Sequence, residues 1–252
     1  MSFKQIDGIK VHYEIKGRKG KPVILLHGWG QNIEMMDYIA EFLKSHFKIY
    51  NLDLPGFGES DDPPTPFSVE DYSIFLKNFA DSFKIENPII IGHSFGCRIA
   101  IHYAYKNPVY KMVLTGAAGI RDKRTLKYYF KTYSYKLGKK LMNVGFFKNK
   151  LAELQKNAGS EDYKNSSGVM RTTFVKVVND DVTPLLKNIS TETLLVFGEC
   201  DEATPVSKGK KMEKLMQNAT LVIFEGDDHY AYFHQGDRFN RVLEAFLKED
   251  YE

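Results

Sequence analysis

The sequence predicts an α/β fold in which a mainly parallel sheet is flanked by helices. Short β-favouring runs alternate with segments of helical periodicity, which is typical of parallel sheets with helices on both faces. At 252 residues the chain is long enough for one large domain, or for a core that carries a modest inserted subdomain. Its composition, 43% hydrophobic and 27% charged, fits a globular protein.

Seven short runs are the expected strands. The run that ends at Leu26 stops abruptly at a glycine-containing loop, as a strand does at the edge of a sheet. Pro88 to Ile91 is apolar and too short for a helix, so we expect a buried central strand there. The seven runs are Val11 to Ile15, Pro22 to Leu26, Phe47 to Leu52, Pro88 to Ile91, Met112 to Thr115, Leu194 to Phe197 and Leu221 to Phe224.

Segments with apolar residues at helical spacing separate these runs. Met36 to Leu43 has this spacing, and so does Tyr72 to Phe83, where Ser68 is the expected N-cap. A further helix is expected from Ser94 to about Tyr105. In Phe239 to Leu247, apolar residues at i, i+3, i+4, i+7 and i+8 predict an amphipathic helix that packs on the sheet.

The alternation of strands and helices breaks between residues 119 and 190. Within this stretch, Arg121 to Lys156 holds eleven Lys or Arg against two acidic residues, with seven aromatic residues interleaved. We expect residues 119–190 to form a helical cap, inserted between the core segments 1–118 and 191–252. The basic residues are expected to form a solvated helical face, with selection of anionic substrates as the alternative.

The run before Ser94 leads straight into Gly92-His93-Ser94-Phe95-Gly96, a G-x-S-x-G pattern between a strand and a helix. Small residues must flank the serine because larger neighbours would collide in so tight a turn. The turn lifts the hydroxyl clear of the sheet, at the positive end of the helix. Ser94 is therefore the candidate nucleophile.

A serine hydroxyl needs a base to accept its proton, and the base needs a partner that fixes its tautomer. His229 follows the last expected strand and is the best of seven histidines for the base. Asp201 follows the strand Leu194 to Phe197, and the order Ser, Asp, His is the one expected for this type of site. Glu199 is a less favoured substitute for Asp201.

Four motifs in this order resemble the α/β-hydrolase superfamily over essentially the whole chain except the insertion. Residues 27–30 resemble its oxyanion loop, residues 53–60 its D-x-P-G-x-G-x-S turn and residues 92–96 its nucleophile elbow, while Asp201 and His229 match the other triad positions. The resemblance implies an α/β-hydrolase fold with a mostly parallel eight-stranded sheet. It also implies an oxyanion hole formed by the backbone NH groups of Trp29 and Phe95.

The resemblance implies a serine hydrolase that works through an acyl-enzyme, and a carboxylesterase acting on small esters is the first expectation. A carbon–carbon bond hydrolase or related lyase of the same fold is the alternative, since fold alone does not separate these reactions. A ligand receptor built on a hydrolase fold is the alternative from another class. His27 and His93 are expected to be structural rather than second bases.

Composition limits the partners that we expect. A formal net charge of +3 is far from that of a typical nucleic-acid-binding protein, so a small-molecule substrate is expected rather than nucleic acid. The sequence contains no run of about 20 apolar residues and no secretory leader, so we expect a cytoplasmic protein without stable membrane insertion. No cofactor or metal is expected, and Cys97 and Cys200 are expected to be reduced thiols. The sequence predicts no oligomeric state.

Overall fold

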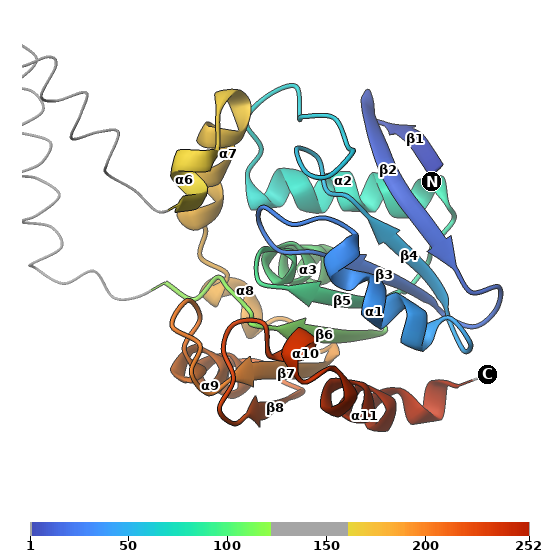
Figure 1. Ribbon diagram of the computed structural model, residues 1–252, viewed down its shortest axis with the longest axis vertical. Coiled ribbons are helices and arrows are strands. Elements are labelled where there is room, and N and C mark those ends of the chain that lie inside the picture. Colours follow the sequence, from blue (N-terminus) through green and yellow to red (C-terminus); the bar gives the residue numbers. More distant parts are fainter. Residues whose placement is uncertain (1, 122–160, 252) are drawn as a thin grey trace, which may run out of the picture.

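The computed structural model describes residues 2–121 and 161–251, which form an eight-stranded sheet with helices on both faces (Figure 1). The strand order across the sheet is β1-β2-β4-β3-β5-β6-β7-β8. The strands are β1 Ser2–Ile6, β2 Ile9–Lys16, β3 Pro22–Leu26, β4 Lys48–Leu52, β5 Ile89–His93, β6 Lys111–Thr115, β7 Glu192–Gly198 and β8 Ala219–Phe224.

The pairing confirms the expected mainly parallel sheet. From β4 to β8 every neighbouring pair is parallel, whereas β1 pairs antiparallel with β2, and β2 with β4. All seven expected strands are present. The resemblance implied eight strands, and the eighth, β1, lies where no run had been assigned to a strand. It joins β2 through Asp7 and Gly8, both with positive φ. This is the turn that Asp-Gly favours in a two-residue hairpin.

Helices cover the two faces of the sheet with separate apolar layers. Helices α1 (Glu34–Leu43) and α11 (Gly236–Leu247) contribute Met36, Leu43, Phe239 and Leu243 to one buried cluster. Helices α2 (Val69–Ser82), α3 (Phe95–Lys106) and α9 (Val206–Leu215) pack on the other face. Because both faces are covered, the central strand β5 is buried along its entire length, as its apolar sequence predicts.

Helix α2 begins where the sequence predicts, because Ser68 satisfies its first turn. The Ser68 hydroxyl accepts a hydrogen bond from the Asp71 backbone NH at 3.2 Å, and the Asp71 carboxylate accepts one from the Ser68 backbone NH at 2.7 Å. This reciprocal capping box satisfies donors that the helix itself leaves unpaired.

The described part of residues 119–190 contains three helices, α6 (Glu161–Asn165), α7 (Gly168–Val178) and α8 (Thr183–Leu186). Helices α6 and α7 lie beyond the carboxyl ends of the parallel strands (Figure 1). The basic segment expected to belong to the cap lies outside the described residues, except for Arg121. The division into core and cap therefore stays a prediction.

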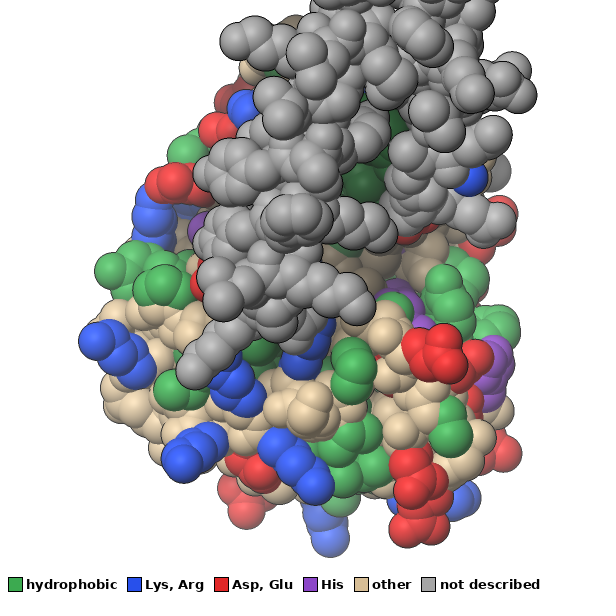
Figure 2. Space-filling view, turned by 90° about the vertical axis from the view of Figure 1, so that its left-hand side faces the viewer, with side chains coloured by type: hydrophobic (Ala, Val, Ile, Leu, Met, Phe, Trp, Pro, Cys, Tyr) green, Lys and Arg blue, Asp and Glu red, His purple; other side chains and the backbone are tan. Residues whose placement is uncertain are grey.

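Figure 2 shows the face toward which the parallel strands point, where positive and negative side chains of the described residues are interspersed. No helix among residues 2–121 and 161–251 has the length and apolar character required to cross a bilayer.

Candidate active site

Loops at the carboxyl ends of three parallel strands bring the three predicted triad side chains together. Ser94 follows β5, Asp201 follows β7, and His229 lies in the loop after β8. Parallel strands that run in the same direction end at the same edge of the sheet, which is where ligand sites of open α/β sheets lie. Residues that are 135 positions apart in the sequence thereby come into contact.

Ser94 occupies a sharp turn between β5 and α3, with the unusual backbone angles φ 49° and ψ −102°. A Cβ atom added to Gly96 would lie 2.3 Å from the Leu26 carbonyl oxygen, and one added to Gly92 would lie 2.9 Å from the Cys97 nitrogen. Only glycine fits at these two positions, which is the steric reason that the motif requires small residues beside the serine.

A continuous chain of hydrogen bonds links the three side chains. His229 Nε2 lies 2.9 Å from Ser94 Oγ, and His229 Nδ1 lies 2.7 Å from Asp201 Oδ2. With the proton on Nδ1, the imidazole donates to the carboxylate and Nε2 accepts from the serine hydroxyl. The arrangement has the geometry of a nucleophile, a general base and a carboxylate that orients the base.

Thr204 is a fourth polar residue of this site, which the sequence analysis missed. Its hydroxyl donates to Asp201 Oδ2 at 2.6 Å, its backbone NH donates to Asp201 Oδ1 at 2.7 Å, and its Oγ1 lies 3.2 Å from His229 Nδ1. Burial alone would raise the pKa of Asp201, but the hydrogen bonds from His229 and Thr204 hold it below its ordinary value. A threonine three residues after the aspartate, followed by Pro205, was the signal for this side-chain turn.

Trp29 and Phe95 both lie beside Ser94 and line the same cavity. Their rings pack edge to face with centroids 5.3 Å apart. Phe95 is the first residue of α3, so its NH belongs to the group of N-terminal donors that a helix does not satisfy. Neither backbone NH donates to an acceptor within the described residues, so both are available to a ligand.

Buried polar residues hold the loop that carries Trp29. His27 Nδ1 donates to the Gly28 carbonyl at 2.7 Å, and His27 Nε2 accepts from the Leu54 NH at 3.0 Å. Burial lowers the pKa of His27 to about 4, so it stays neutral at physiological pH. The buried carboxylate of Asp53 accepts from the NH groups of Ile33 and Glu59 at 2.8 and 2.9 Å. These contacts agree with the expected structural role of His27.

His93 also makes the contacts expected of a structural residue. Its Nδ1 donates to the Thr115 carbonyl at 3.2 Å, and burial, which is the largest cause, lowers its pKa to about 3. The two cysteines are free thiols: Cys97 is buried, where desolvation raises its pKa, and Cys200 is exposed.

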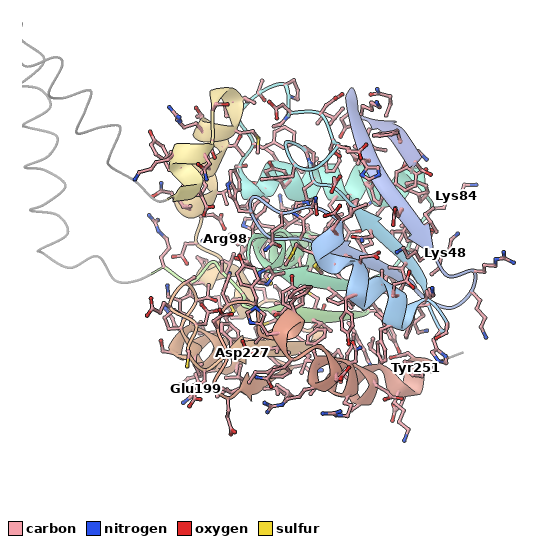
Figure 3. All side chains as sticks on the ribbon, viewed as in Figure 1. Lys48, Lys84, Arg98, Glu199, Asp227 and Tyr251 are labelled. Atoms are coloured by element: carbon pink, nitrogen blue, oxygen red, sulfur yellow. The ribbon has the colours of Figure 1, made fainter. Side chains whose placement is uncertain are left out.

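Glu199 does not take the place of Asp201. Its carboxylate is exposed and accepts from the Gly226 NH at 3.0 Å, and Figure 3 shows Glu199 at the outer edge of the molecule.

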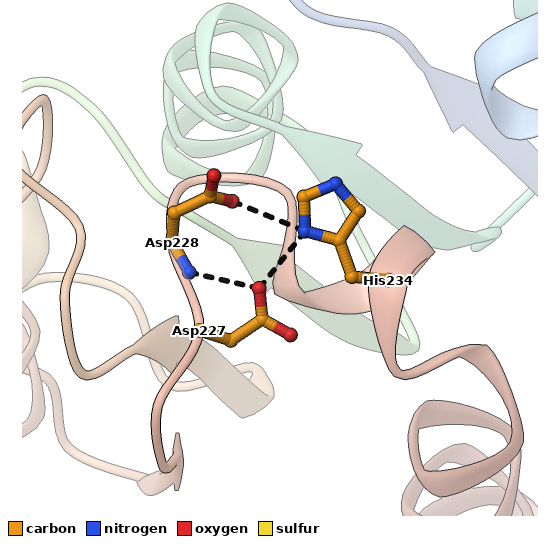
Figure 4. A group of neighbouring side chains, drawn as sticks. All are labelled: Asp227, Asp228 and His234. Atoms are coloured by element: carbon orange, nitrogen blue, oxygen red, sulfur yellow. Dashed lines mark hydrogen bonds and ion pairs between the residues drawn. The ribbon is translucent and has the colours of Figure 1, made fainter.

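Asp227 and Asp228, on the loop that carries His229, form a second polar group with His234 of the following helix (Figure 4). Asp227 Oδ1 lies 2.9 Å from His234 Nδ1 and accepts from the Asp228 NH at 2.8 Å, while Asp228 Oδ1 lies 3.3 Å from the same imidazole nitrogen. Burial would raise the pKa of Asp227, but these hydrogen bonds hold it below its ordinary value. The group ties the loop to α10 (Ala231–His234).

Two hollows share Trp29 in their lining, and one of them contains Ser94. The first has a volume of about 320 Å³ and contains Ser94, Arg98 and Thr204 together with an apolar wall. The wall includes Phe174 and Val177 of α7. The second hollow, of about 510 Å³, shares Trp29 with the first and is lined by polar residues that include Gln31 and Ser166. Trp29 thus lines both an apolar hollow and a polar one.

Comparison with known proteins gives consistent results. The family model described as the alpha/beta hydrolase fold matches residues 21–235. The AB hydrolase superfamily protein YisY of Bacillus subtilis is 26% identical, over 90% of this chain and 91% of its own length. A 2-hydroxy-6-oxononadienedioate/2-hydroxy-6-oxononatrienedioate hydrolase of Comamonas testosteroni is 27% identical, over 97% of this chain and 93% of its own length.

Solved structures share the same fold. The meta-cleavage product hydrolase CumD of Pseudomonas fluorescens IP01 superimposes with a TM-score of 0.75 at 25% identity, covering 99% of this chain and 98% of its own. An esterase of Exiguobacterium antarcticum superimposes with a TM-score of 0.76 at 22% identity, covering 98% of this chain and 99% of its own. The expected fold is confirmed, and the family match over most of its length shows that the chain belongs to the α/β-hydrolase family.

Proposed function

We propose that the protein is a serine hydrolase in which Ser94 is the nucleophile, His229 the general base and Asp201 the carboxylate that orients the histidine. The observation that carries this proposal is the unbroken hydrogen-bond chain from Ser94 Oγ through the imidazole to Asp201 Oδ2, with distances of 2.9 and 2.7 Å. The protein belongs to a hydrolase family, and we expect it to act on a small-molecule substrate.

In the proposed reaction, Ser94 Oγ attacks a carbonyl carbon while His229 Nε2 takes the hydroxyl proton. The negative charge that develops on the carbonyl oxygen is stabilised by the backbone NH groups of Trp29 and Phe95. The imidazolium returns the proton to the leaving group, which produces an acyl-enzyme. Water, deprotonated by the same imidazole, then hydrolyses the acyl-enzyme and regenerates Ser94.

A small carboxylic ester is the substrate class that the site supports best. The cavity beside Ser94 is at the lower end of the usual range for ligand sites, at about 320 Å³, and Phe174 and Val177 form part of its apolar wall. Such a wall favours a short acyl chain, while the polar hollow that shares Trp29 suits an alcohol with hydrogen-bonding groups.

Carbon–carbon bond hydrolysis is the second candidate. Similarity to hydrolases of 2-hydroxy-6-oxo dienoates favours it, at 25 to 27% identity over nearly the whole chain. The same nucleophile would attack the ketone carbonyl of such a substrate, and the same backbone NH groups would stabilise the negative charge on its oxygen. We also propose that residues 119–190 form the cap over this site.

The test is hydrolysis of p-nitrophenyl esters of increasing acyl length by the wild type, Ser94→Ala and the matched control Ser82→Ala. Ser82 lies at the end of α2, where its hydroxyl donates to a backbone carbonyl. We expect activity and fluorophosphonate labelling to vanish only in Ser94→Ala. Equal activity in wild type and Ser94→Ala would overturn the proposal.

The same proteins distinguish the second candidate. The second assay follows the chromophore of 2-hydroxy-6-oxo-6-phenylhexa-2,4-dienoate. If this compound is consumed faster than the esters, and only when Ser94 is present, the carbon–carbon hydrolase is favoured. Absence of both turnover and labelling in the wild type would favour the receptor alternative.

A further inference from the structure

Arg98 is a cationic side chain beside the candidate nucleophile that the proposed reaction does not use. It lies in the first turn of α3, four residues after Ser94, which is the N-cap residue of that helix. Arg98 and Ser94 line the same cavity of about 320 Å³. Figure 3 shows Arg98 on the side of the sheet toward which the parallel strands point.

The guanidinium is mostly buried and only partly paired. Its side chain is 13% exposed, and NH1 donates to the Asp180 carbonyl oxygen at 2.9 Å. The nearest carboxylate oxygen of Asp180 is 3.8 Å away, beyond hydrogen-bond distance, and His102 Nε2 lies 3.1 and 3.2 Å from the two oxygens of that carboxylate.

Arginine carries five N–H donors, and one of them is used within the described residues. Asp180 therefore anchors the guanidinium at one edge and offsets its charge without filling its donor sites. A planar carboxylate is the group that fits the remaining donors, because guanidinium and carboxylate can form two parallel hydrogen bonds.

The other lining residues strengthen such a contact. Trp29, Phe174, Val177 and Val178 are apolar, and an ionic hydrogen bond is stronger in apolar surroundings than in water. Asp162 also lines the cavity, but its side chain is exposed and has an interaction of its own.

We propose that Arg98 is the specificity-determining residue of this site and binds the carboxylate of a monoanionic substrate whose reacting carbonyl lies at Ser94. This inference rests on the proposed function and narrows its substrate class to short-chain acyl compounds that carry a second, ionised carboxyl group.

The size of the cavity limits the length of the substrate. Ser94 and Arg98 line one cavity of about 320 Å³, so the acyl chain between the reacting carbonyl and the carboxylate must be short. A glutaryl group, with three methylene groups between its two carboxyl carbons, is the reference acyl group.

The experiment compares p-nitrophenyl hemiglutarate with the neutral, similarly shaped p-nitrophenyl 5-methylhexanoate. The measured quantity is the ratio of their kcat/KM values in wild type, Arg98→Gln and Arg98→Lys. Lys106→Gln is the matched control, because it removes a cation from the far end of the same helix, where Lys106 pairs with Glu70. Thermal unfolding of each variant checks that it is folded.

We expect the wild type to favour the hemiglutarate, and Arg98→Gln to lower the ratio by about tenfold to a hundredfold, as for loss of a hydrogen bond between charged groups. Arg98→Lys keeps the charge but not the forked geometry of the guanidinium, so its ratio should lie between those of the wild type and Arg98→Gln. Lys106→Gln should keep the wild-type ratio. An equal ratio in wild type and Arg98→Gln, or a wild type that favours the neutral ester, would overturn the inference.

A binding measurement separates this inference from the proposed function. If the wild type hydrolyses neither ester, calorimetric titration with monomethyl glutarate decides the role of Arg98. Binding at least about tenfold weaker in Arg98→Gln than in the wild type would support the carboxylate site without turnover. Equal binding by the two proteins, or absence of binding to the wild type, would refute it.

Discussion

Replacing Thr204 with valine removes one hydroxyl group from the candidate triad while nearly preserving the shape of the side chain. The Thr204 hydroxyl donates to Asp201 Oδ2 at 2.6 Å, and the Asp201 side chain is 0% exposed. Water therefore does not replace the lost donor, and the carboxylate keeps one fewer hydrogen bond. The backbone NH of residue 204, which donates to Asp201 Oδ1, is unaffected by the substitution.

A hydrogen bond to a charged group contributes about 1.5 to 3 kcal/mol, which corresponds to about tenfold to 150-fold in an equilibrium or rate constant. If the bond orients Asp201 against His229, Thr204→Val should lower kcat/KM for p-nitrophenyl esters within that range. Thr204→Ser restores the donor and should stay within about threefold of the wild type. A wild-type rate in Thr204→Val, or an equal loss in both variants, would refute this reasoning.

The same substitution changes how stability depends on pH. The pKa of Asp201 in the folded protein is below the ordinary 3.8, so its ionised form stabilises the fold above that pH, and this contribution is lost as pH falls through the folded-state pKa. Loss of the Thr204 donor moves the folded-state pKa up. Thr204→Val should therefore be less stable than the wild type in urea at pH 7, and the difference should narrow toward pH 3. A constant difference would contradict this account.

Three further predictions concern the surroundings of the site. Gly96→Ala places a Cβ atom 2.3 Å from the Leu26 carbonyl oxygen, so it should destabilise the protein by at least about 1 to 3 kcal/mol in urea titration, and a wild-type midpoint would contradict the proposed clash. Asp53→Asn replaces the carboxylate that accepts from the Ile33 and Glu59 NH groups with a neutral amide, so it should lower esterase kcat by about tenfold and slow fluorophosphonate labelling in parallel. Unchanged labelling would exclude a role of Asp53 in loop positioning. Asp250→Asn breaks the buried ion pair with Lys111 at 2.8 Å, so it should lower the melting temperature at pH 7 and leave the activity unchanged. Loss of activity in a folded Asp250→Asn variant would contradict the expectation that this ion pair is independent of the active site.

Much of the fold could be predicted because its signals are local. Apolar runs such as Pro88 to Ile91 are buried on both faces of a parallel sheet, and the capping box at Ser68 fixes the start of a helix within four residues. Strand β1 was missed because Ser2–Ile6 is largely exposed and lacks an apolar run, although Asp7-Gly8 carried a hairpin signal.

The candidate site, too, could be predicted only in part from local signals. Ser94, Asp201 and His229 could be chosen because each follows a strand in a characteristic order, and their mutual distances agree with the choice. The contact of Thr204 with Asp201 is local, three residues along one loop, but its contact with His229 depends on how two loops fold against each other, which no local pattern specifies. Arg98 was not singled out from the sequence, because its contact with Asp180 spans 82 positions.

Residues 119–121, at the start of the proposed cap, lie against residues 179–182, near its end. The Val182 NH donates to the Gly119 carbonyl at 3.1 Å, and Arg121 NH2 donates to Asn179 Oδ1 at 3.2 Å. A loop whose ends are already held together loses little additional entropy when residues are added between them, about 0.6 kcal/mol for each doubling of its length. Segments of different length and sequence can therefore be exchanged between these two ends, which makes this junction the natural point for building chimaeras with new substrate preferences on an unchanged core.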